Sequence, residues 1–530
     1  SKDTINRTVQ YCRTLGKVVI VCKDRPGFVV NRFFVPWLNE ACLLLEEGVA
    51  TAAQIDAISC KAFRIGLGPF GLMNLTGPPI ALHSTDYLAE QLNTSRYTGA
   101  QNLRDLVAEN VMWPIEDDSE YSQEQYTAVS ERLLGVVFGV AAQIVEEDIC
   151  SMEDVDRGAK VGLRWARGPF EMMNRIGVAE AYRMAQSYRA IAGDAWALPS
   201  FFKEQADAST NWDFSYVDLF VEDGIATITI NRPEAMNALN EVVVAQLTEA
   251  VQVANADSKV STVVLDGAGK AFVAGADVKF FVDKIRSDDI PDIETFTANG
   301  HALLAAIEDS PKTTIALTTG LALGGGLELA LACDYRIGTQ RTQFRFPETS
   351  IGIYPALGGT QRPARIAGRE LGRWAVLAGN FMNAETATDL GLVTHLVDIN
   401  DVPNCINDIH TSGKPGNKYP GRPMNENSPV VKFAKKFFSD GNMAALLAGG
   451  CPEGFDAEDK TVARQLKSLK FTAPIGLAMA SERIDATASM SLDEGLQLEL
   501  QGLDRIFSTE DALEGLSALI EGRRATYKNA

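Results

Sequence analysis

Two glutamates are the residues of this sequence best suited to move protons. Glu328 lies inside the apolar run "GLELALA", and Glu348 follows twenty residues later in "RFPETSIGI". A carboxylate among Leu and Ala is expected on a buried helical face, where an ionised side chain is costly unless it is paired or used. The pattern therefore leaves two interpretations, a pair of catalytic carboxylates or two structural ion pairs.

Two glycine turns could serve the same site. The glycines of "LALGGGLEL" separate a predicted strand at 311–320 from the helix that carries Glu328, and "AFVAGADV" enters a second predicted helix with Asp277 as its expected N-cap. Backbone N–H groups can approach a ligand closely at such junctions, and the positive end of the helix dipole points the same way. One N–H from each turn would stabilise a developing oxyanion. Either turn alone is more often only a tight turn, but the combination favours adding water to a double bond beside a thioester carbonyl.

The elements that would position these residues follow an α/β pattern after residue 216. Residues 217–230 alternate apolar and polar side chains around Asp223-Gly224, which predicts a two-stranded hairpin. An amphipathic helix is expected at 241–257, and the buried strand "VSTVVLDGAG" follows it. Strand–helix alternation of this kind predicts a core of largely buried strands.

The first 200 residues contain an internal repeat. Residues 32–77 recur one hundred positions later in a single ungapped register. Both copies carry long segments with helical apolar periodicity, so we predict two homologous all-α units packed on each other. The identical positions are Arg32/Arg132, Glu46/Glu146, Glu47/Glu147, Asp56/Asp156, Gly68/Gly168, Pro69/Pro169, Phe70/Phe170, Met73/Met173, Asn74/Asn174 and Gly77/Gly177.

The first copy also contains "GLGPFG" at 66–71, which satisfies the dinucleotide-binding pattern GxGxxG. That pattern must follow a strand and open a helix. Here the preceding segment is helical in character, Pro69 interrupts the loop, and the second copy has lost the pattern. We therefore interpret it as a tight turn between helices.

Composition argues against several classes of function. The net charge of −20 and the absence of a basic stripe argue against a nucleic-acid partner. The eight cysteines are scattered without metal-ligand spacing, which predicts no metal site and fits a reducing compartment. None of the four histidines lies beside a Ser or Cys in a nucleophile motif. The start is polar and no run reaches eighteen apolar residues, so we expect a soluble, cytoplasmic protein without a membrane segment.

The N-terminal part resembles a known family. "LGKVVIVCKDRPGFVVNRFFVPWLNEACLLLEEGVATAAQID" with "GLGPFGLMN" is similar to the C-terminal domain of L-3-hydroxyacyl-CoA dehydrogenases, and the second copy resembles the doubled domain of multifunctional fatty-acid oxidation proteins. By the motif "GFVVNR", Asn31 corresponds to the family's active-site Asn; a helix N-cap is the alternative for this residue. The rest of the NAD-binding domain would precede Ser1, so we expect NAD to bind only to a longer form of the protein.

The C-terminal part resembles the crotonase (enoyl-CoA hydratase) superfamily. "INRPEAMNALN", "GKAFVAGADV", "GLALGGGLELALACD" and "FPETSIGIYPALGGTQR" occur in family order. The resemblance implies that Ala276 and Gly325 form the oxyanion hole and that Glu328 and Glu348 are the two catalytic glutamates of true hydratases. It implies substrate-binding positions at Ala235, Met236, Ala274 and Ala356. Two departures are Ala356, where hydratases often have Gly, and Glu234, where Lys is common near the CoA phosphates.

These resemblances imply a multidomain protein, with all-α tandem dehydrogenase domains before an α/β crotonase domain of ββα-spiral type. The implied activity is enoyl-CoA hydration on an acyl-CoA thioester without NAD or metal. An enoyl-CoA isomerase and a non-catalytic acyl-CoA-binding scaffold are the alternatives, and either part could form a homo-oligomer. The expected boundaries are a remnant of the NAD-binding domain at 1–24, helical domains at 25–110 and 111–200, and the crotonase domain at 216–530 with an insertion at about 408–460.

Overall fold

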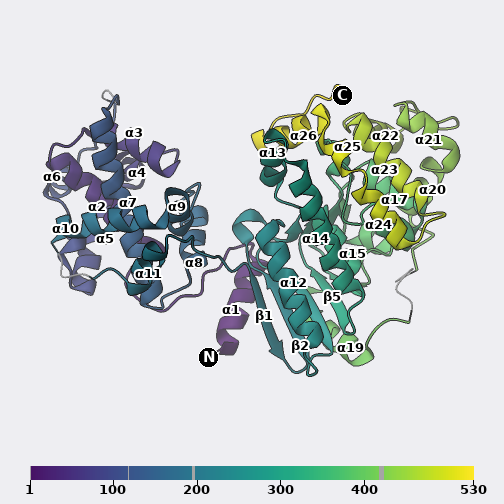
Figure 1. Ribbon diagram of the computed structural model, residues 1–530, viewed down its shortest axis with the longest axis horizontal. Coiled ribbons are helices and arrows are strands. Elements are labelled where there is room, and N and C mark those ends of the chain that lie inside the picture. The colour runs from purple at the N-terminus through teal and green to yellow at the C-terminus, as the bar shows by residue number, and fades with distance from the viewer. Residues whose placement is uncertain (1, 117–118, 194–196, 417–422, 530) are drawn as a thin grey trace. The chain divides into compact units, whose positions relative to one another are not determined.

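The computed structural model describes residues 2–116, 119–193, 197–416 and 423–529 (Figure 1). The chain divides into two compact units. The first contains residues 18–215 together with the first nine residues, and the second contains residues 216–530 together with residues 10–17. The helix α1 (Lys2–Thr14) is thereby divided between them.

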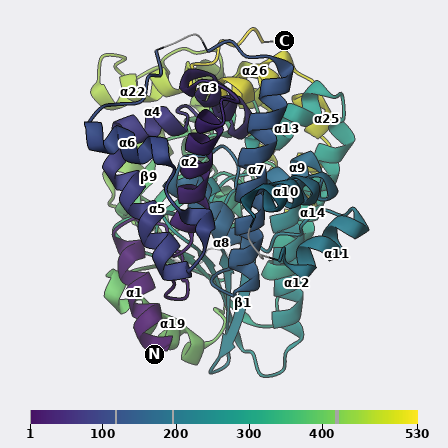
Figure 2. The ribbon, with the colours of Figure 1, turned by 90° about the vertical axis from the view of Figure 1, so that its left-hand side faces the viewer.

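The first unit is all-α, as the helical periodicity predicts. Several of its helices begin at capping residues: the side chains of Thr51 and Ser122 each accept the N–H three residues on, and the Gln at that position bonds back. The long helices α2 and α7 run side by side (Figure 2). The helices of this unit are α2 (Val30–Glu46), α3 (Ala52–Phe63), α4 (Pro69–Thr76), α5 (Pro78–Leu92), α6 (Gln101–Glu109), α7 (Gln123–Glu146), α8 (Met152–Arg157), α9 (Pro169–Ile176), α10 (Val178–Ala192) and α11 (Ser200–Ala208).

The two repeats exchange ion pairs in a reciprocal way. Arg32 of the first copy bonds Glu147 of the second at 3.2 Å, and Arg132 of the second bonds Glu47 of the first at 2.5 Å. Arg132 makes a further bond of 2.7 Å to the buried Glu40. Because the paired residues are the equivalent positions of the repeat, the copies pack about a local pseudo-twofold relation, as expected for two repeated units packed on each other.

The segment "GLGPFG" is the N-terminus of α4 and follows the helix α3, so it is a turn between helices. The side chain of Asp56 accepts the N–H groups of Phe70 and Gly71 there, both at 2.8 Å. Asp156 makes the equivalent two contacts at the start of α9. The interpretation of the pattern as a tight turn is therefore confirmed.

The core of the first unit is rich in aromatic side chains. Trp37 and Phe63 each lie within 6 Å of Trp165, with centroid separations of 5.6 and 4.9 Å. Among the described residues, α7 is the one helix long and apolar enough to cross a membrane, and most of its apolar stretch is buried within this unit.

The second unit is built from two sheets. A six-stranded sheet has the order β1-β2-β3-β5-β7-β10, parallel except for the pair β1 and β2, and a four-stranded sheet has the order β4-β6-β8-β9. The strands are β1 (Val217–Glu222), β2 (Ile225–Ile230), β3 (Thr262–Gly267), β4 (Ala271–Ala274), β5 (Thr313–Thr318), β6 (Leu321–Leu323), β7 (Tyr335–Gly338), β8 (Gln343–Arg345), β9 (Met382–Asn383) and β10 (His395–Leu396). Successive pairs β3–β4, β5–β6 and β7–β8 place one strand in each sheet before the chain enters helices. This is the predicted ββα spiral.

Helices cover these sheets and carry the C-terminal part of the chain (Figure 1). The expected amphipathic helix is α12, and Asp277 caps α13 by accepting the N–H of Lys279. The helices are α12 (Glu241–Ala256), α13 (Val278–Arg286), α14 (Ile290–Glu308), α15 (Gly325–Ala332), α16 (Arg362–Ala367), α17 (Arg369–Leu377), α18 (Ala384–Asp389), α19 (Val402–Ser412), α20 (Pro429–Phe437), α21 (Asp440–Leu447), α22 (Lys460–Leu469), α23 (Pro474–Ala486), α24 (Leu492–Leu500), α25 (Leu503–Phe507) and α26 (Glu510–Glu521), with short 3₁₀ turns η3 (Pro233–Ala235) and η4 (Glu348–Ile351).

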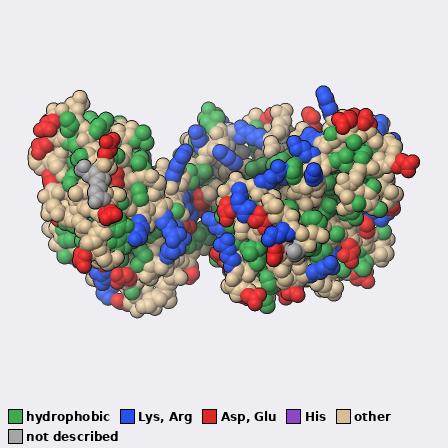
Figure 3. Space-filling view, turned by 90° about the horizontal axis from the view of Figure 1, so that it is seen from above, with side chains coloured by type: hydrophobic (Ala, Val, Ile, Leu, Met, Phe, Trp, Pro, Cys, Tyr) green, Lys and Arg blue, Asp and Glu red, His purple; other side chains and the backbone are tan. Residues whose placement is uncertain are grey.

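The expected insertion at 408–460 is partly helical. Its predicted helix is α20, which packs against α17, and its glycine- and proline-rich part includes residues 417–422, which lie outside the described residues. On the face drawn in Figure 3, Lys and Arg side chains of the second unit are interspersed with Asp and Glu.

Candidate active site

A cavity of about 280 Å³ lies inside the second unit. Its walls come from the end of β4, the start of α15, the turn η4, the segment after it and the C-terminal helices. Of the residues proposed from the sequence, those that line it are Met236, Ala274, Ala276, Gly325, Glu328, Glu348 and Ala356. Ala235 ends the turn η3 next to Met236 and does not line the cavity.

The glycine junction before α15 sets one wall. Gly324 has φ +47°, a conformation that favours glycine, and Gly325 is the first residue of the helix. A Cβ on Gly325 would lie 3.9 Å from the backbone N of Ala276, so the two turns face each other across a short gap. In the described part of the chain, no hydrogen bond uses the N–H of Ala276 or Gly325. Two backbone donors therefore remain available to a ligand oxygen.

Glu328 is held by the backbone of a loop. Only 2% of its surface is exposed, and its Oε1 accepts the N–H groups of Leu357 at 2.7 Å and Gly359 at 2.6 Å. Burial raises the pKa of Glu328 well above its ordinary value, and the nearby carboxylates of Glu348 and Glu499 raise it further. The two N–H donors act in the opposite direction by stabilising the ionised form.

Glu348 lies at the start of η4 and is 7% exposed. Its Oε2 is buried without a hydrogen-bond partner among the described residues. Burial raises the pKa of Glu348 to about 8, against a lowering effect of its own backbone N–H and of Arg345. At neutral pH this carboxyl therefore keeps its proton. A negative charge on either Glu328 or Glu348 disfavours ionisation of the other, so the pair is expected to share one proton.

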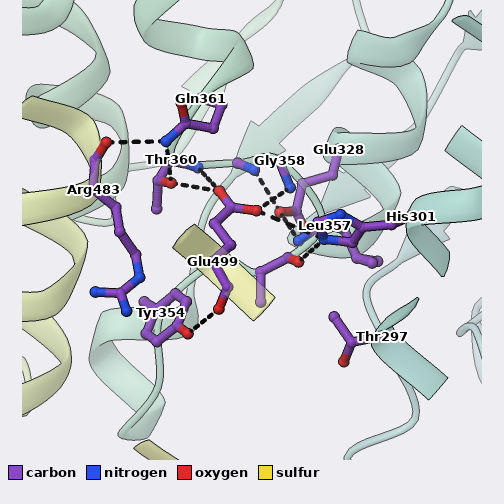
Figure 4. A network of polar contacts seen from close by, with 12 residues as sticks. Thr297, His301, Glu328, Tyr354, Leu357, Gly358, Thr360, Gln361, Arg483 and Glu499 are labelled. Atoms are coloured by element: carbon purple, nitrogen blue, oxygen red, sulfur yellow. Dashed lines mark hydrogen bonds and ion pairs between the residues drawn. The ribbon is translucent and has the colours of Figure 1, made fainter. Parts of the chain in front are cut away.

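A third buried glutamate contacts the same loop and was missed from the sequence. Glu499 on α24 is fully buried and accepts the N–H groups of Gly358 at 2.6 Å and Thr360 at 3.1 Å (Figure 4). Burial raises its pKa to about 7. The sequence signal was present, since "LQLELQ" places a Glu among Leu residues as "GLELALA" does.

His301 on α14 was also missed. Its Nε2 lies 2.5 Å from the carbonyl oxygen of Ala356 and 3.9 Å from the carboxylate of Glu499. Burial lowers the pKa of His301, so the ring is neutral. Figure 4 shows His301, Glu328 and Glu499 converging on the segment that contains Leu357.

Most of the remaining lining is apolar, and Arg345, Thr297 and Tyr354 are its polar members. Phe281 of α13 stacks on Phe507 of α25 with ring centroids 5.2 Å apart, and Phe296, Leu516 and Leu519 add to the same wall. Such a lining suits a hydrocarbon chain next to the polar end of the site.

The other expected positions lie elsewhere. Asn31 is the second residue of α2, whose N-cap is Val29, so the alternative interpretation of Asn31 as a helix N-cap is wrong. It lines a separate cavity of about 500 Å³ in the first unit together with Arg25, His83 and Tyr87. Across the described ranges, no group of three His, Cys, Asp or Glu residues could hold a metal ion.

Comparison with known proteins agrees with this architecture. The model of the enoyl-CoA hydratase/isomerase family matches residues 225–528, and that of the 3-hydroxyacyl-CoA dehydrogenase C-terminal domain matches residues 27–113 and 129–211. A probable enoyl-CoA hydratase of Rhizobium meliloti (strain 1021) is 30% identical over 59% of this chain and 99% of its own length. A crotonyl-CoA hydratase of Syntrophomonas wolfei is 30% identical over 58% of this chain and 95% of its own.

A solved structure gives the same result. The crystal structure of an enoyl-CoA hydratase from Rhodobacter sphaeroides 2.4.1 aligns with a TM-score of 0.51 at 28% identity, covering 58% of this chain and 90% of that one. The fold and site define an acyl-CoA enzyme of the crotonase class. The chain belongs to the enoyl-CoA hydratase/isomerase family, and two dehydrogenase C-terminal domains precede that part.

Proposed function

We propose that this chain is an enoyl-CoA hydratase that adds water syn across a trans-2-enoyl-CoA to give the 3-hydroxyacyl-CoA. The observation that carries the proposal is the meeting of two buried glutamates with two unused backbone N–H groups in one cavity. Hydration needs both kinds of group. Negative charge develops on the thioester oxygen, while water loses a proton as it bonds to Cβ and the adjacent Cα gains one.

The thioester oxygen would accept the N–H groups of Ala276 and Gly325. Burial raises the pKa of both glutamates, so the coupled pair holds one proton near neutral pH. We place the negative charge on Glu328, because Leu357 and Gly359 donate N–H groups to it, whereas Oε2 of Glu348 has no donor among the described residues. The carboxylate of Glu328 would take a proton from water as the water oxygen bonds to Cβ. The protonated carboxyl of Glu348 would deliver its proton to Cα. The water's proton then remains on Glu328, and its return to Glu348 or solvent completes the cycle.

Other parts of the proposal follow from the family. Ala235, Met236 and Ala274 would contact the CoA portion through their main chain, and the N–H of Ala356 would help to hold the water. Acyl-CoA is the substrate and no cofactor takes part in hydration. The same proposal includes the domain boundaries given above and a cytoplasmic location. It also includes self-association, no nucleic-acid or membrane partner, and NAD binding by a longer form of the protein.

The test is the loss of enoyl-thioester absorbance when the chain is mixed with crotonyl-CoA in the absence of NAD. Turnover that depends on enzyme concentration supports the hydratase. Binding of crotonyl-CoA and of a longer enoyl-CoA without turnover of either would contradict it.

An enoyl-CoA isomerase is the second candidate, because the matching family model covers hydratases and isomerases alike. Isomerisation moves one proton between carbons and needs one carboxylate. Retention of both Glu328 and Glu348 in the cavity favours hydration.

A further inference from the structure

The segment from Ala356 to Thr360 runs between two buried carboxylates. The N–H groups of Leu357 and Gly359 point to Glu328, and those of Gly358 and Thr360 point to Glu499. Successive N–H groups thus alternate between the two glutamates. Glu328 keeps its two donors only while the segment stays in place, and Glu499 holds the segment from the opposite side.

His301 fixes one peptide of this segment. A carbonyl oxygen can only accept, so the contact of 2.5 Å requires that His301 carry its proton on Nε2 and donate it to Ala356. The peptide that joins Ala356 to Leu357 is planar. Its carbonyl is therefore held by His301 while its N–H is held by Glu328.

Glu499 is itself anchored. Its own carbonyl oxygen accepts the hydroxyl of Tyr354 at 2.5 Å, and its carboxylate also accepts the hydroxyl of Thr360. These contacts tie α24 to Thr360 at the end of the segment and to Tyr354, two residues before its start (Figure 4). Neither His301 nor Glu499 is among the residues that line the cavity, so both act from behind its wall.

We propose that His301 and Glu499 are positioning residues that hold the Ala356–Thr360 segment, and through it the Glu328 carboxylate, in the geometry that hydration requires. This inference rests on the proposed function. The segment transmits their effect, because its N–H groups are the donors that orient Glu328 and its first two residues line the cavity.

The matched test compares two substitutions at His301. His301→Gln keeps a side-chain N–H donor near the position of Nε2, whereas His301→Leu fills similar space without a donor. We expect His301→Leu to lower kcat for crotonyl-CoA by roughly 10- to 100-fold with KM within about twofold, as for a misplaced catalytic group. His301→Gln should keep kcat within about threefold of the original chain.

Glu499→Gln gives an independent variant. Both oxygens of Glu499 accept backbone N–H groups, whereas a Gln amide has one oxygen and one NH2 group. In Glu499→Gln the NH2 group would therefore face a backbone N–H, and one hydrogen bond would be lost. We expect a fall in kcat similar to that of His301→Leu. The control is Asp156→Asn in the first unit, which disturbs the same kind of buried carboxylate and backbone contact and should leave kcat unchanged.

Hydrogen exchange provides a readout that does not need activity. Amides of residues 357–360 should exchange faster in His301→Leu and Glu499→Gln than in the original chain and His301→Gln. Equal kcat and equal exchange in His301→Leu and His301→Gln would overturn the inference, as would a loss of kcat in both. If the original chain fails to hydrate any enoyl-CoA, the proposed function is refuted. Unchanged exchange in both His301→Leu and Glu499→Gln would separately refute the positioning role.

Discussion

Gly324 and Glu348 are in such close contact that a single added carbon would not fit between them. A Cβ on Gly324 would lie 2.2 Å from Oε1 of Glu348. The same glycine has φ +47° and precedes the first residue of α15. One backbone position therefore governs both the glycine junction and the place of a candidate catalytic carboxylate.

Gly324→Ala should lower kcat by about 100-fold or more, because Glu348 must move and the Gly325 N–H turns with the strained backbone. Steady-state kinetics with crotonyl-CoA checks this. Gly449→Ala is the matched control: Gly449 also has positive φ but no atom within 4 Å of an added Cβ, so that variant should keep full activity. Equal activity of the two variants would contradict the importance of the contact.

Glu348→Gln should abolish hydration and stabilise the fold at alkaline pH. The pKa of Glu348 is raised to about 8, so the folded state holds a proton that the unfolded state loses near the ordinary value of 4.5. The stability linked to this proton is complete below about pH 4.5 and is lost as pH rises through about 8. Gln is neutral throughout, so its Tm advantage should be absent at pH 5 and about 2–5 °C at pH 9. A constant Tm difference across this range would contradict the assignment.

Glu328→Gln should separate the two candidate activities. Gln can still accept the N–H groups of Leu357 and Gly359 through its Oε1, so the loop is kept while the base is lost. Hydration of crotonyl-CoA should fall by roughly 10³-fold. Conversion of a 3-enoyl-CoA to its 2-enoyl isomer should be measured in parallel, since an isomerase that uses Glu348 alone would retain that activity.

The rate of hydration should fall as pH rises above about 8. Glu348 must carry a proton to deliver it, and its pKa of about 8 marks the pH at which that proton is lost. Because Glu328 must stay ionised, the rate should also fall on the acid side and give a bell-shaped profile. A kcat profile that stays level to pH 9.5, in a chain that circular dichroism shows to remain folded, would argue against this role.

Arg132→Met should destabilise the first unit by about 3 kcal/mol, because it leaves the buried Glu40 without its cation. Urea unfolding followed by tryptophan fluorescence measures this. Arg183→Met is the control, since Arg183 pairs with Glu131 and Glu180 at the surface and its loss should cost less than about 1 kcal/mol. Similar midpoints for the two variants would show that the buried pair contributes little.

Much of the architecture could be predicted because it depends on local pattern. Alternation around Asp223-Gly224 predicts the hairpin β1–β2, and glycine turns before helical runs predict the start of α15 and α13. The two glutamates lie on segments that the motifs already name, and both line one cavity.

The support behind the site could not be predicted. His301 and Glu499 lie on α14 and α24, far from Ala356 in sequence. The Glu among Leu residues in "LQLELQ" marks Glu499 as unusual, but no local pattern shows that it and His301 meet the loop at Ala356–Thr360. The alternative of Asn31 as a cap failed for a related reason, since the helix begins at Val30, two residues earlier than a cap at Asn31 would place its start.

The reciprocal ion pairs of the first unit bear on how its two repeats can evolve. In a dimer of identical chains, each substitution at the interface appears twice, on both sides of the axis. Here the position equivalent to Glu40 is the buried Val140, so Arg132 has a second acidic partner that the opposite half does not reproduce. Joining the copies in one chain keeps them together at any dilution and lets each side of the interface evolve alone.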